Sequence, residues 1–103
     1  MTWRLDIRPE AEDDIRQAAR WYENEQTGLG VDFTEIAYAG IDSLADNPLL
    51  YRLRARYRRR EIRWLLTSRF PYRVIYYLED DSIRIFAVLH AKRSERFWRE
   101  RLN

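Results

Sequence analysis

Hydrophobic residues follow two different spacings near the start of the chain. Over residues 2–7 they alternate with polar residues, as in a short β-strand, and from Pro9 onward they recur every three or four positions, as on one face of a helix. Proline is favoured at the first position of a helix, and the acids that follow it are stabilised by the positive end of the helix dipole. We therefore expect a strand and then a helix that ends near residues 26–27, with Gly28 as its left-handed cap.

A second stripe of helical spacing predicts another helix from about Val31 to Ala45, closed by Asn47–Pro48. Gly40 lies on the same face as the apolar side chains of this stripe. A glycine inside a helix costs about 1 kcal/mol of helix propensity. We expect the first helix to approach closely at Gly40, because tight packing there would compensate for this cost.

The second half of the chain is rich in β-branched and aromatic residues in alternating patterns. After a loop, these patterns predict three strands, at about residues 57–66, 72–79 and 82–90. The acidic turn at residues 79–82 joins the last two strands as an antiparallel hairpin. Ser94 can cap a short final helix over residues 95–102.

Helices grouped before strands favour an α+β fold. We expect an N-terminal strand and a helical hairpin packed on a small antiparallel sheet, followed by a short C-terminal helix, in a single domain that covers residues 1–103. A sheet that carries helices on one side only would leave its other face open to solvent.

The composition fits a soluble globular protein. Hydrophobic residues make up 46% of the chain, so disorder is not expected even though 35% of the residues are charged. The absence of cysteine excludes disulfides and thiolate metal sites and fits a reducing compartment. No apolar run approaches the ~20 residues of a membrane span, and the first residues lack the hydrophobic segment of a signal peptide. We therefore expect a cytoplasmic protein that does not bind membranes.

Charge is divided unequally between the two halves of the chain. Residues 1–50 contain four arginines and eleven acids, a net charge of −7, whereas residues 51–103 contain fifteen basic residues and six acids, a net charge of +9. The second half is therefore expected to form a basic surface whose partner is nucleic acid or an acidic protein segment. The alternative is that the two halves neutralise each other within the fold.

Most signatures of catalysis and cofactor binding are absent from the sequence. The chain has one histidine and no cysteine, so it lacks the ligands of the usual zinc sites, and it contains no phosphate-binding glycine loop. We interpret Gly28 and Gly30 as a turn between helices, and the carboxylates at residues 12–14 as a solvated helix start. No cofactor and no metal ion are expected.

The last two predicted strands carry the best candidates for chemistry. Histidine is the residue type that titrates near neutral pH, so His90 could transfer protons; alternatively, it hydrogen-bonds the chain at the end of its strand. Arg73 points away from the face of its neighbours, where it could meet a phosphate or carboxylate or form a surface salt bridge. Arg93 follows the end of the last strand and could share a site with His90.

The densest basic run of the chain lies just before these strands, with Tyr51, Tyr57 and Trp64 interleaved. Its arginines are Arg52, Arg54, Arg56, Arg58, Arg59, Arg60 and Arg63. Arginine combined with aromatic residues is typical of surfaces that bind nucleic acid or acidic peptides. The aromatic residues could instead belong to the core, and we expect this of Trp64.

Five short motifs are spread over nearly the whole chain. They are Ala18–Tyr22, Gly28–Gly30 with Phe33, Asn47–Pro48, Phe70–Tyr76, and the closing group Ile85, Val88, His90 and Arg93 with Trp98 beyond it. In this order and spacing they resemble the toxins of bacterial type II toxin–antitoxin modules in the RelE/ParE superfamily, and its ParE-like branch in particular.

This resemblance implies a compact α+β domain and a cognate antitoxin whose C-terminal segment wraps the toxin. An antitoxin with a DNA-binding N-terminal domain and an acidic C-terminal segment that folds on binding would suit the basic half of the chain. The candidate residues for binding the antitoxin or the cellular target are Arg58, Arg59, Arg60, Arg63, Arg73, His90, Arg93 and Trp98.

The superfamily offers two functions for such a toxin. ParE-like members bind and inhibit DNA gyrase, which requires a surface rather than a set of proton-transfer groups. RelE-like members are metal-independent ribonucleases that cut mRNA in the ribosome; Arg73 and Arg93 match their arginines, but their lysine pair and late tyrosine are missing here, and only His90 could act as the base. We expect a non-enzymatic gyrase inhibitor, with the ribonuclease and a degenerate member that binds only its antitoxin as alternatives.

Overall fold

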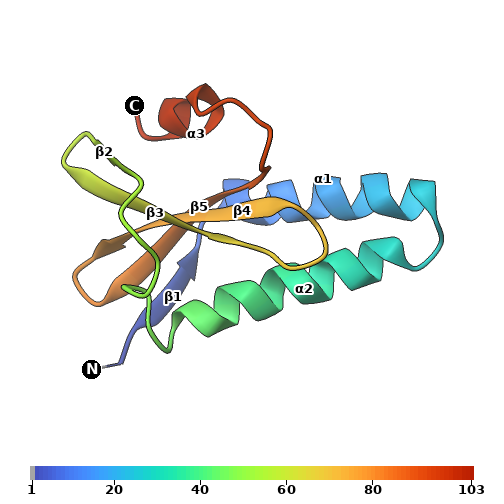
Figure 1. The fold of residues 1–103 in the computed structure, drawn as a ribbon, viewed down its shortest axis with the longest axis horizontal. Coiled ribbons are helices and arrows are strands. Elements are labelled where there is room, and N and C mark those ends of the chain that lie inside the picture. Colours follow the sequence, from blue (N-terminus) through green and yellow to red (C-terminus); the bar gives the residue numbers. More distant parts are fainter. Residues whose placement is uncertain (1) are drawn as a thin grey trace.

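Figure 1 shows the computed structural model of the protein, which describes residues 2–103. The chain forms, in order, β1 (Arg4–Ile7), α1 (Pro9–Glu25), α2 (Leu29–Leu44), β2 (Ala55–Tyr57), β3 (Arg60–Leu66), β4 (Tyr72–Glu79), β5 (Ser82–His90) and α3 (Arg96–Arg101). The α+β class expected from the sequence is confirmed. Within residues 2–103, none of the helices is both long and apolar enough to cross a membrane.

The strands form one five-stranded sheet in the order β1-β5-β4-β3-β2. The pairs β2–β3, β3–β4 and β4–β5 are antiparallel, as expected for strands joined by short connections. In contrast, β1 runs parallel to β5, with Leu5 opposite Ile83. The sequence did not predict this pairing, which makes neighbours of the first and last strands of the chain.

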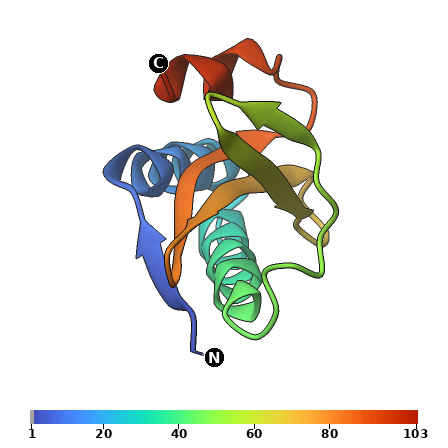
Figure 2. The same ribbon diagram turned by 90° about the vertical axis from the view of Figure 1, so that its left-hand side faces the viewer.

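Helices cover both faces of the sheet (Figures 1 and 2). α1 and α2 lie side by side against one face, and α3 lies over the other. Because side chains alternate along β4, Val74 and Tyr76 belong to the core beneath α1 and α2, whereas Ile75 belongs to the core beneath α3. The prediction that the second face is open is therefore wrong: α3 covers it, with the fully buried Trp98 inserted beneath.

The two cores differ in size. The main core, between the sheet and the two long helices, comprises Ala11, Ile15, Ala18, Phe33, Ala37, Ile41, Leu44, Phe70, Val74, Tyr76, Ile83, Ile85 and Val88. The second core, beneath α3, comprises Ile62, Ile75, Phe86, Ala87, Leu89 and Trp98. Trp64 was expected to be a core residue, but it is only partly buried and packs against the rim of the second core.

Glycines lie where α2 begins and where it closely approaches α1 and β3. Gly28 has a φ of +95°, so its predicted left-handed conformation is confirmed, but it precedes α2 rather than capping α1, which ends at Glu25. A Cβ on Gly30 would lie 2.6 Å from the carbonyl oxygen of Ala19 in α1, so the two helices approach closely here. The prediction that Gly40 approaches the first helix is wrong, because it faces the Leu65 side chain of β3.

The basic segment before β4 forms a hairpin rather than a loop followed by one strand. β2 pairs with β3, with Tyr57 opposite Arg60, and Arg58 and Arg59 form the turn. Both turn residues have positive φ, 50° and 66°. Two-residue hairpin turns of this kind usually contain asparagine and glycine. The hairpin was not predicted, because the two arginines at its turn are not residues that usually indicate one.

α3 is attached to the rest of the molecule by a partly buried ion pair. The guanidinium of Arg101 donates to both carboxylate oxygens of Asp14, at 2.6 and 2.8 Å. The same carboxylate accepts the N–H of Val88, and Arg101 also donates to the carbonyl of Phe86. The hydrogen bond that Arg101 donates to Asp14 raises the pKa of its guanidinium. Asp14 was interpreted as part of a solvated helix start, but its side chain is only 11% exposed.

Candidate functional site

The motif aromatics converge at the end of the molecule where α1 meets α2. Tyr22, Phe33, Phe70 and Tyr72 form one packed cluster, with ring centroids 4.7–5.5 Å apart between neighbours. Burial, with a smaller contribution from Tyr22, raises the pKa of Tyr72 to about 12, so its hydroxyl stays neutral. These motif residues therefore hold the core together rather than forming a reactive site.

A small cavity of about 250 Å³ lies beside this cluster. Its lining includes Trp21 from α1, Tyr72 from β4, and both His90 and Arg93 from the end of β5 and the segment after it. The structure thus brings His90 and Arg93 to one site, as their closeness in the sequence suggested. Trp21 was not among the candidate binding residues expected from the sequence. Its side chain is 58% exposed, which is unusual for tryptophan and leaves a large aromatic surface available to a partner.

His90 is held by the chain around it. Its Nδ1 accepts a hydrogen bond from the backbone N–H of Lys92 at 3.1 Å, and its ring meets that of Tyr72 edge-on at 5.4 Å. The structure therefore favours the interpretation that His90 hydrogen-bonds the chain at the end of its strand. Since Nδ1 is engaged in this bond, only Nε2 could take part in proton transfer.

Arg73 is neither a free arginine on an open face nor part of a surface salt bridge. Its side chain is only 7% exposed, donates to the carbonyl oxygen of Arg93 at 2.8 Å, and lies over the ring of Trp64 at 4.9 Å. Burial lowers the pKa of its guanidinium. Arg73 therefore connects β4 to the segment that leads into α3, and it offers almost no surface to a ligand.

The three candidate ribonuclease residues do not converge. His90 is paired with Tyr72, whose side chain packs against the core beneath α1 and α2. Arg73 follows Tyr72 in β4 and so points to the opposite face, beneath the α3 segment. Arg93 lines the cavity with His90, and its guanidinium lies 4.0 Å from the ring centroid of Phe97. The sheet thus separates the single candidate base from the buried arginine.

The four basic candidates from the hairpin are not equivalent. Arg58 and Arg59 are exposed at the turn. Arg60 is partly buried, and its guanidinium lies 4.8 Å from the ring centroid of Tyr77. Arg63 is largely buried and donates to the carbonyl oxygen of Tyr51 at 2.9 Å. Only the turn arginines are therefore free to bind a partner, and Trp98, fully buried under α3, is not.

Part of the charge asymmetry is neutralised inside the fold. Among the described residues, four ion pairs join the two halves of the chain: Arg4–Asp81, Asp6–Arg84, Asp14–Arg101 and Asp32–Arg69. The hydrogen bond from Arg84 lowers the pKa of Asp6. None of these pairs involves the arginines of residues 52–60, so the basic surface predicted from the sequence persists at the β2–β3 hairpin.

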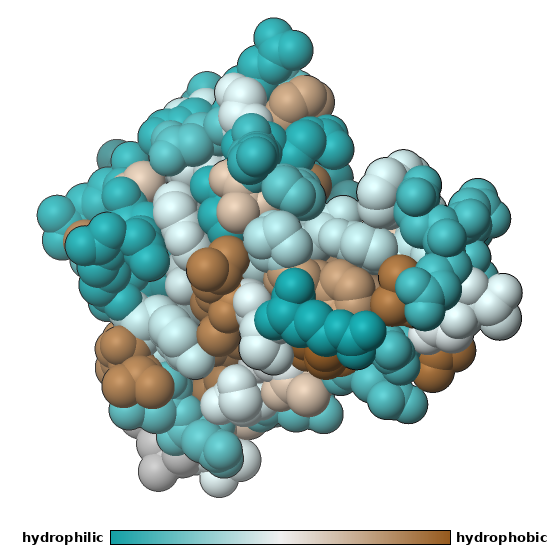
Figure 3. All heavy atoms as spheres, turned by 45° about the vertical axis from the view of Figure 1, so that its right-hand side comes forward, coloured by the Kyte–Doolittle hydropathy of each residue, from teal (hydrophilic) through white to brown (hydrophobic). Residues whose placement is uncertain are grey.

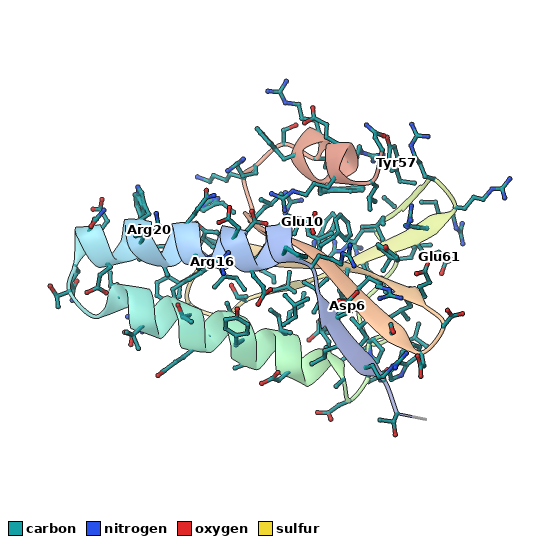
Figure 4. All side chains as sticks on the ribbon, turned by 180° about the vertical axis from the view of Figure 1, so that it is seen from behind. Asp6, Glu10, Arg16, Arg20, Tyr57 and Glu61 are labelled. Carbon is teal, nitrogen blue, oxygen red and sulfur yellow. The ribbon has the colours of Figure 1, made fainter. Side chains whose placement is uncertain are left out.

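The outer side of the two long helices carries a groove of about 600 Å³ that the sequence analysis missed. Ile15, Ala19, Val31 and Tyr38 contribute to its apolar lining. Arg16 and Arg20 also line it; Figure 4 shows both on α1. The available signal was Val31, an apolar residue off the buried stripe of α2 and 60% exposed. On the face of the molecule in Figure 3, by comparison, apolar areas are small and separated by hydrophilic surface.

Within residues 2–103, no cluster of three or more histidine, cysteine, aspartate or glutamate side chains could hold a metal ion. The polar residues that line the cavity are Asp14, Gln17, Tyr72, His90 and Arg93. Asp14 is already paired with Arg101, so Arg93 is the cation of this set. Such a set can bind carboxylates or phosphates through charge-assisted hydrogen bonds.

Comparisons with known proteins agree with this fold. A family model described as the ParE toxin of the type II toxin–antitoxin system parDE matches residues 5–95. A solved structure from the chromosomal ParDE toxin–antitoxin system of P. aeruginosa is similar over 88% of this chain and 98% of that chain, with a TM-score of 0.73 and 14% identity, a likeness that concerns the fold alone. No curated protein sequence gave a match. Because the family model spans most of its length, the chain belongs to the ParE toxin family of type II toxin–antitoxin systems.

Proposed function

We propose that this ParE-family toxin inhibits growth by binding DNA gyrase in the bacterial cytoplasm, and that a co-encoded antitoxin neutralises it. The observation that carries the choice of a binding protein over an enzyme is the separation of His90 from Arg73 by the sheet. Cleavage of RNA needs a base, an acid and cations around one phosphate. Binding a target needs only a surface.

The decisive experiment compares the two activities in parallel. Purified full-length protein is added to gyrase with relaxed plasmid, and separately to ribosomes engaged on mRNA. We expect loss of supercoiling at toxin concentrations comparable to that of gyrase, and no cleavage of the mRNA. Unaffected gyrase together with codon-phased mRNA cuts would instead support the ribonuclease. No effect in either assay would support a member that binds only its antitoxin.

The antitoxin, we propose, engages the cavity formed by Trp21, Tyr72, His90 and Arg93. A protein partner needs an apolar anchor as well as polar contacts, and the exposed ring of Trp21 beside the guanidinium of Arg93 supplies both. An acidic segment would place an apolar side chain on Trp21 and a carboxylate on Arg93.

Calorimetry with the antitoxin encoded next to the toxin gene tests this interface. The variant Trp21→Ala should weaken the complex at least tenfold, as expected for a central aromatic anchor. Leu66→Ala, which truncates another exposed apolar residue at the end of β3, serves as the matched control and should leave the affinity within about twofold. Equal effects of the two variants would refute this placement.

A further inference from the structure

The turn of the β2–β3 hairpin contains residues that are unfavourable for its backbone conformation. Arg58 and Arg59 both adopt left-handed φ values, 50° and 66°, in a two-residue turn between Tyr57 and Arg60. A side chain in this region crowds the following carbonyl, which is why glycine and asparagine dominate such turns. The fold would be easier to form with other residues at these two positions, so the arginines call for a reason outside local geometry.

The arginines of the turn contribute little to the folded protein. Neither Arg58 nor Arg59 forms an ion pair among residues 2–103, and the one side-chain hydrogen bond that either makes there joins the Nε of Arg58 to the Oδ1 of Asn103 at 3.1 Å. Two further exposed arginines, Arg54 just before β2 and Arg96 at the start of α3, also lack a carboxylate partner within this part of the chain. Their charges are therefore available to a ligand.

Arginines of the hairpin and of α3 share one surface. The hydroxyl of Tyr57 donates to the Oδ1 of Asn103 at 2.6 Å, and the guanidinium of Arg99 lies 5.1 Å from the centroid of the Tyr57 ring. Figures 1 and 2 show the hairpin at a corner of the molecule beside α3, and Figure 4 shows Tyr57 next to that helix. We call Arg54, Arg58, Arg59 and Arg96 the basic corner.

The surroundings of the basic corner distinguish between an acidic protein and a nucleic acid. The exposed large hydrophobic side chains are Trp21, Val31, Leu49, Leu50 and Leu66, and none lies in residues 54–60 or in α3. A protein partner would find no largely exposed apolar side chain to bury there, although buried aromatic side chains are common among the hot spots of protein interfaces. The phosphate backbone of a nucleic acid needs only cations, and arginine pairs with phosphate oxygens bidentately.

We propose that the basic corner binds the phosphodiester backbone of a nucleic-acid duplex without reading its sequence. Arg58 and Arg59 contact phosphates at the tip of the hairpin, and Arg54 and Arg96 extend the contact toward β2 and α3. The binding is a property of the toxin alone and does not require that gyrase be its target.

The test uses a substitution that improves the fold while removing the charges. The double variant Arg58→Asn/Arg59→Gly installs the preferred turn residues, so its melting temperature should rise by a few degrees. Fluorescence anisotropy measures binding of the full-length protein to labelled DNA and RNA duplexes of one sequence, between ~50 and ~200 mM salt. The variant should bind about ten- to a hundredfold more weakly, and the dependence of log affinity on log salt should become shallower by about two units.

A matched variant controls for net charge. Arg16→Gln/Arg20→Gln also removes two positive charges, but on α1, far from the basic corner (Figure 4), and it should leave the affinity within about twofold. Binding to either duplex that is lost only in the turn variant supports the proposal. Three outcomes would overturn it: no binding to either duplex, an equal loss in both variants, or turn-dependent binding of polyglutamate without binding of either duplex. Gyrase is absent from the assay, so a failed supercoiling experiment leaves this result unaffected.

Discussion

The two faces of the sheet are built from the same strands but are covered in different ways. On one face, the 17-residue α1 and the 16-residue α2 bury a large aliphatic and aromatic core, and their outer surface is mostly acidic. On the other face, the six-residue α3 covers a smaller core, surrounded by arginines. The first layer therefore contains most of the buried core, whereas the second combines a smaller core with the exposed arginines of the β2–β3 hairpin and α3.

Removing an aromatic ring from the larger core should have the greatest effect. Phe33 is fully buried and touches the rings of Tyr22, Phe70 and Tyr72. Phe33→Ala should lower the free energy of unfolding by about 3–5 kcal/mol, because it removes burial and leaves a cavity. Urea denaturation followed by circular dichroism measures this. A loss below about 1 kcal/mol would contradict the importance assigned to this core.

Breaking the ion pair that attaches α3 should have the next largest effect. Asp14→Ala leaves the guanidinium of Arg101 partly buried without its carboxylate and should cost about 2–4 kcal/mol. Hydrogen exchange should show faster exchange in α3 than in α1 or α2 of this variant. The double variant Asp14→Ala/Arg101→Leu should recover part of the stability, because no charge is left unpaired. A double variant that is less stable than Asp14→Ala would argue against this mechanism.

Two glycines in α2 test whether this helix packs more tightly against α1 or against β3. An added Cβ at Gly30 would meet the backbone oxygen of Ala19 at 2.6 Å, so Gly30→Ala should cost about 1–3 kcal/mol. At Gly40 the obstacle is the end of the Leu65 side chain at 2.9 Å, which can rotate away. Gly40→Ala should therefore be close to neutral, since its helix propensity offsets the repacking. Thermal unfolding of both variants measures whether Gly30→Ala is the more destabilising of the two. A smaller loss for Gly30→Ala than for Gly40→Ala would mean that α1 and α2 have room to separate.

The smallest expected effect concerns the acid dependence of stability. The hydrogen bond from Arg84 lowers the pKa of Asp6 below its ordinary value of 3.8. The stabilisation that this pair provides is therefore complete above about pH 4 and is lost as the pH falls through the lower pKa of the folded state. The free energy of unfolding of Asp6→Asn should depend less on pH below about pH 4 than that of the unmodified protein. Near neutral pH the two free energies should differ by less than about 1 kcal/mol. Urea titrations at several pH values measure this, and an unchanged acid slope would exclude the contribution of Asp6.

Much of the fold could be predicted because its long elements carry strong periodic patterns. The stripe through Ile15 and Ala18 defined α1, and the alternating residues around the acidic turn defined β4 and β5. The turn of the β2–β3 hairpin could not be found, since Arg58 and Arg59 carry no turn signal. The parallel pairing of β1 with β5 depends on contacts between the two ends of the chain, which local patterns do not encode.

The site was predictable to a smaller extent. Alternation along β4 correctly separated Arg73 from Tyr72, but it could not reveal that the α3 segment covers Arg73. Proximity in sequence suggested that His90 and Arg93 share a site, and the cavity beside Trp21 brings them together. Arg60 and Arg63 looked equivalent to Arg58 and Arg59 in the sequence. What separates them are tertiary contacts, of Arg60 with the ring of Tyr77 and of Arg63 with the carbonyl oxygen of Tyr51, which local patterns do not encode.

The parallel pairing of β1 with β5 has a consequence for how the protein can be divided. A cut in the segment between α2 and β2 would leave β1, α1 and α2 on one fragment and the strands β2–β5 with α3 on the other. Each fragment would then carry one half of the main core and one partner of the Asp14–Arg101 pair. Neither fragment could complete the sheet alone, but each presents the surface that the other lacks. The complete sheet and the main core therefore form only where the two ends of the chain come together.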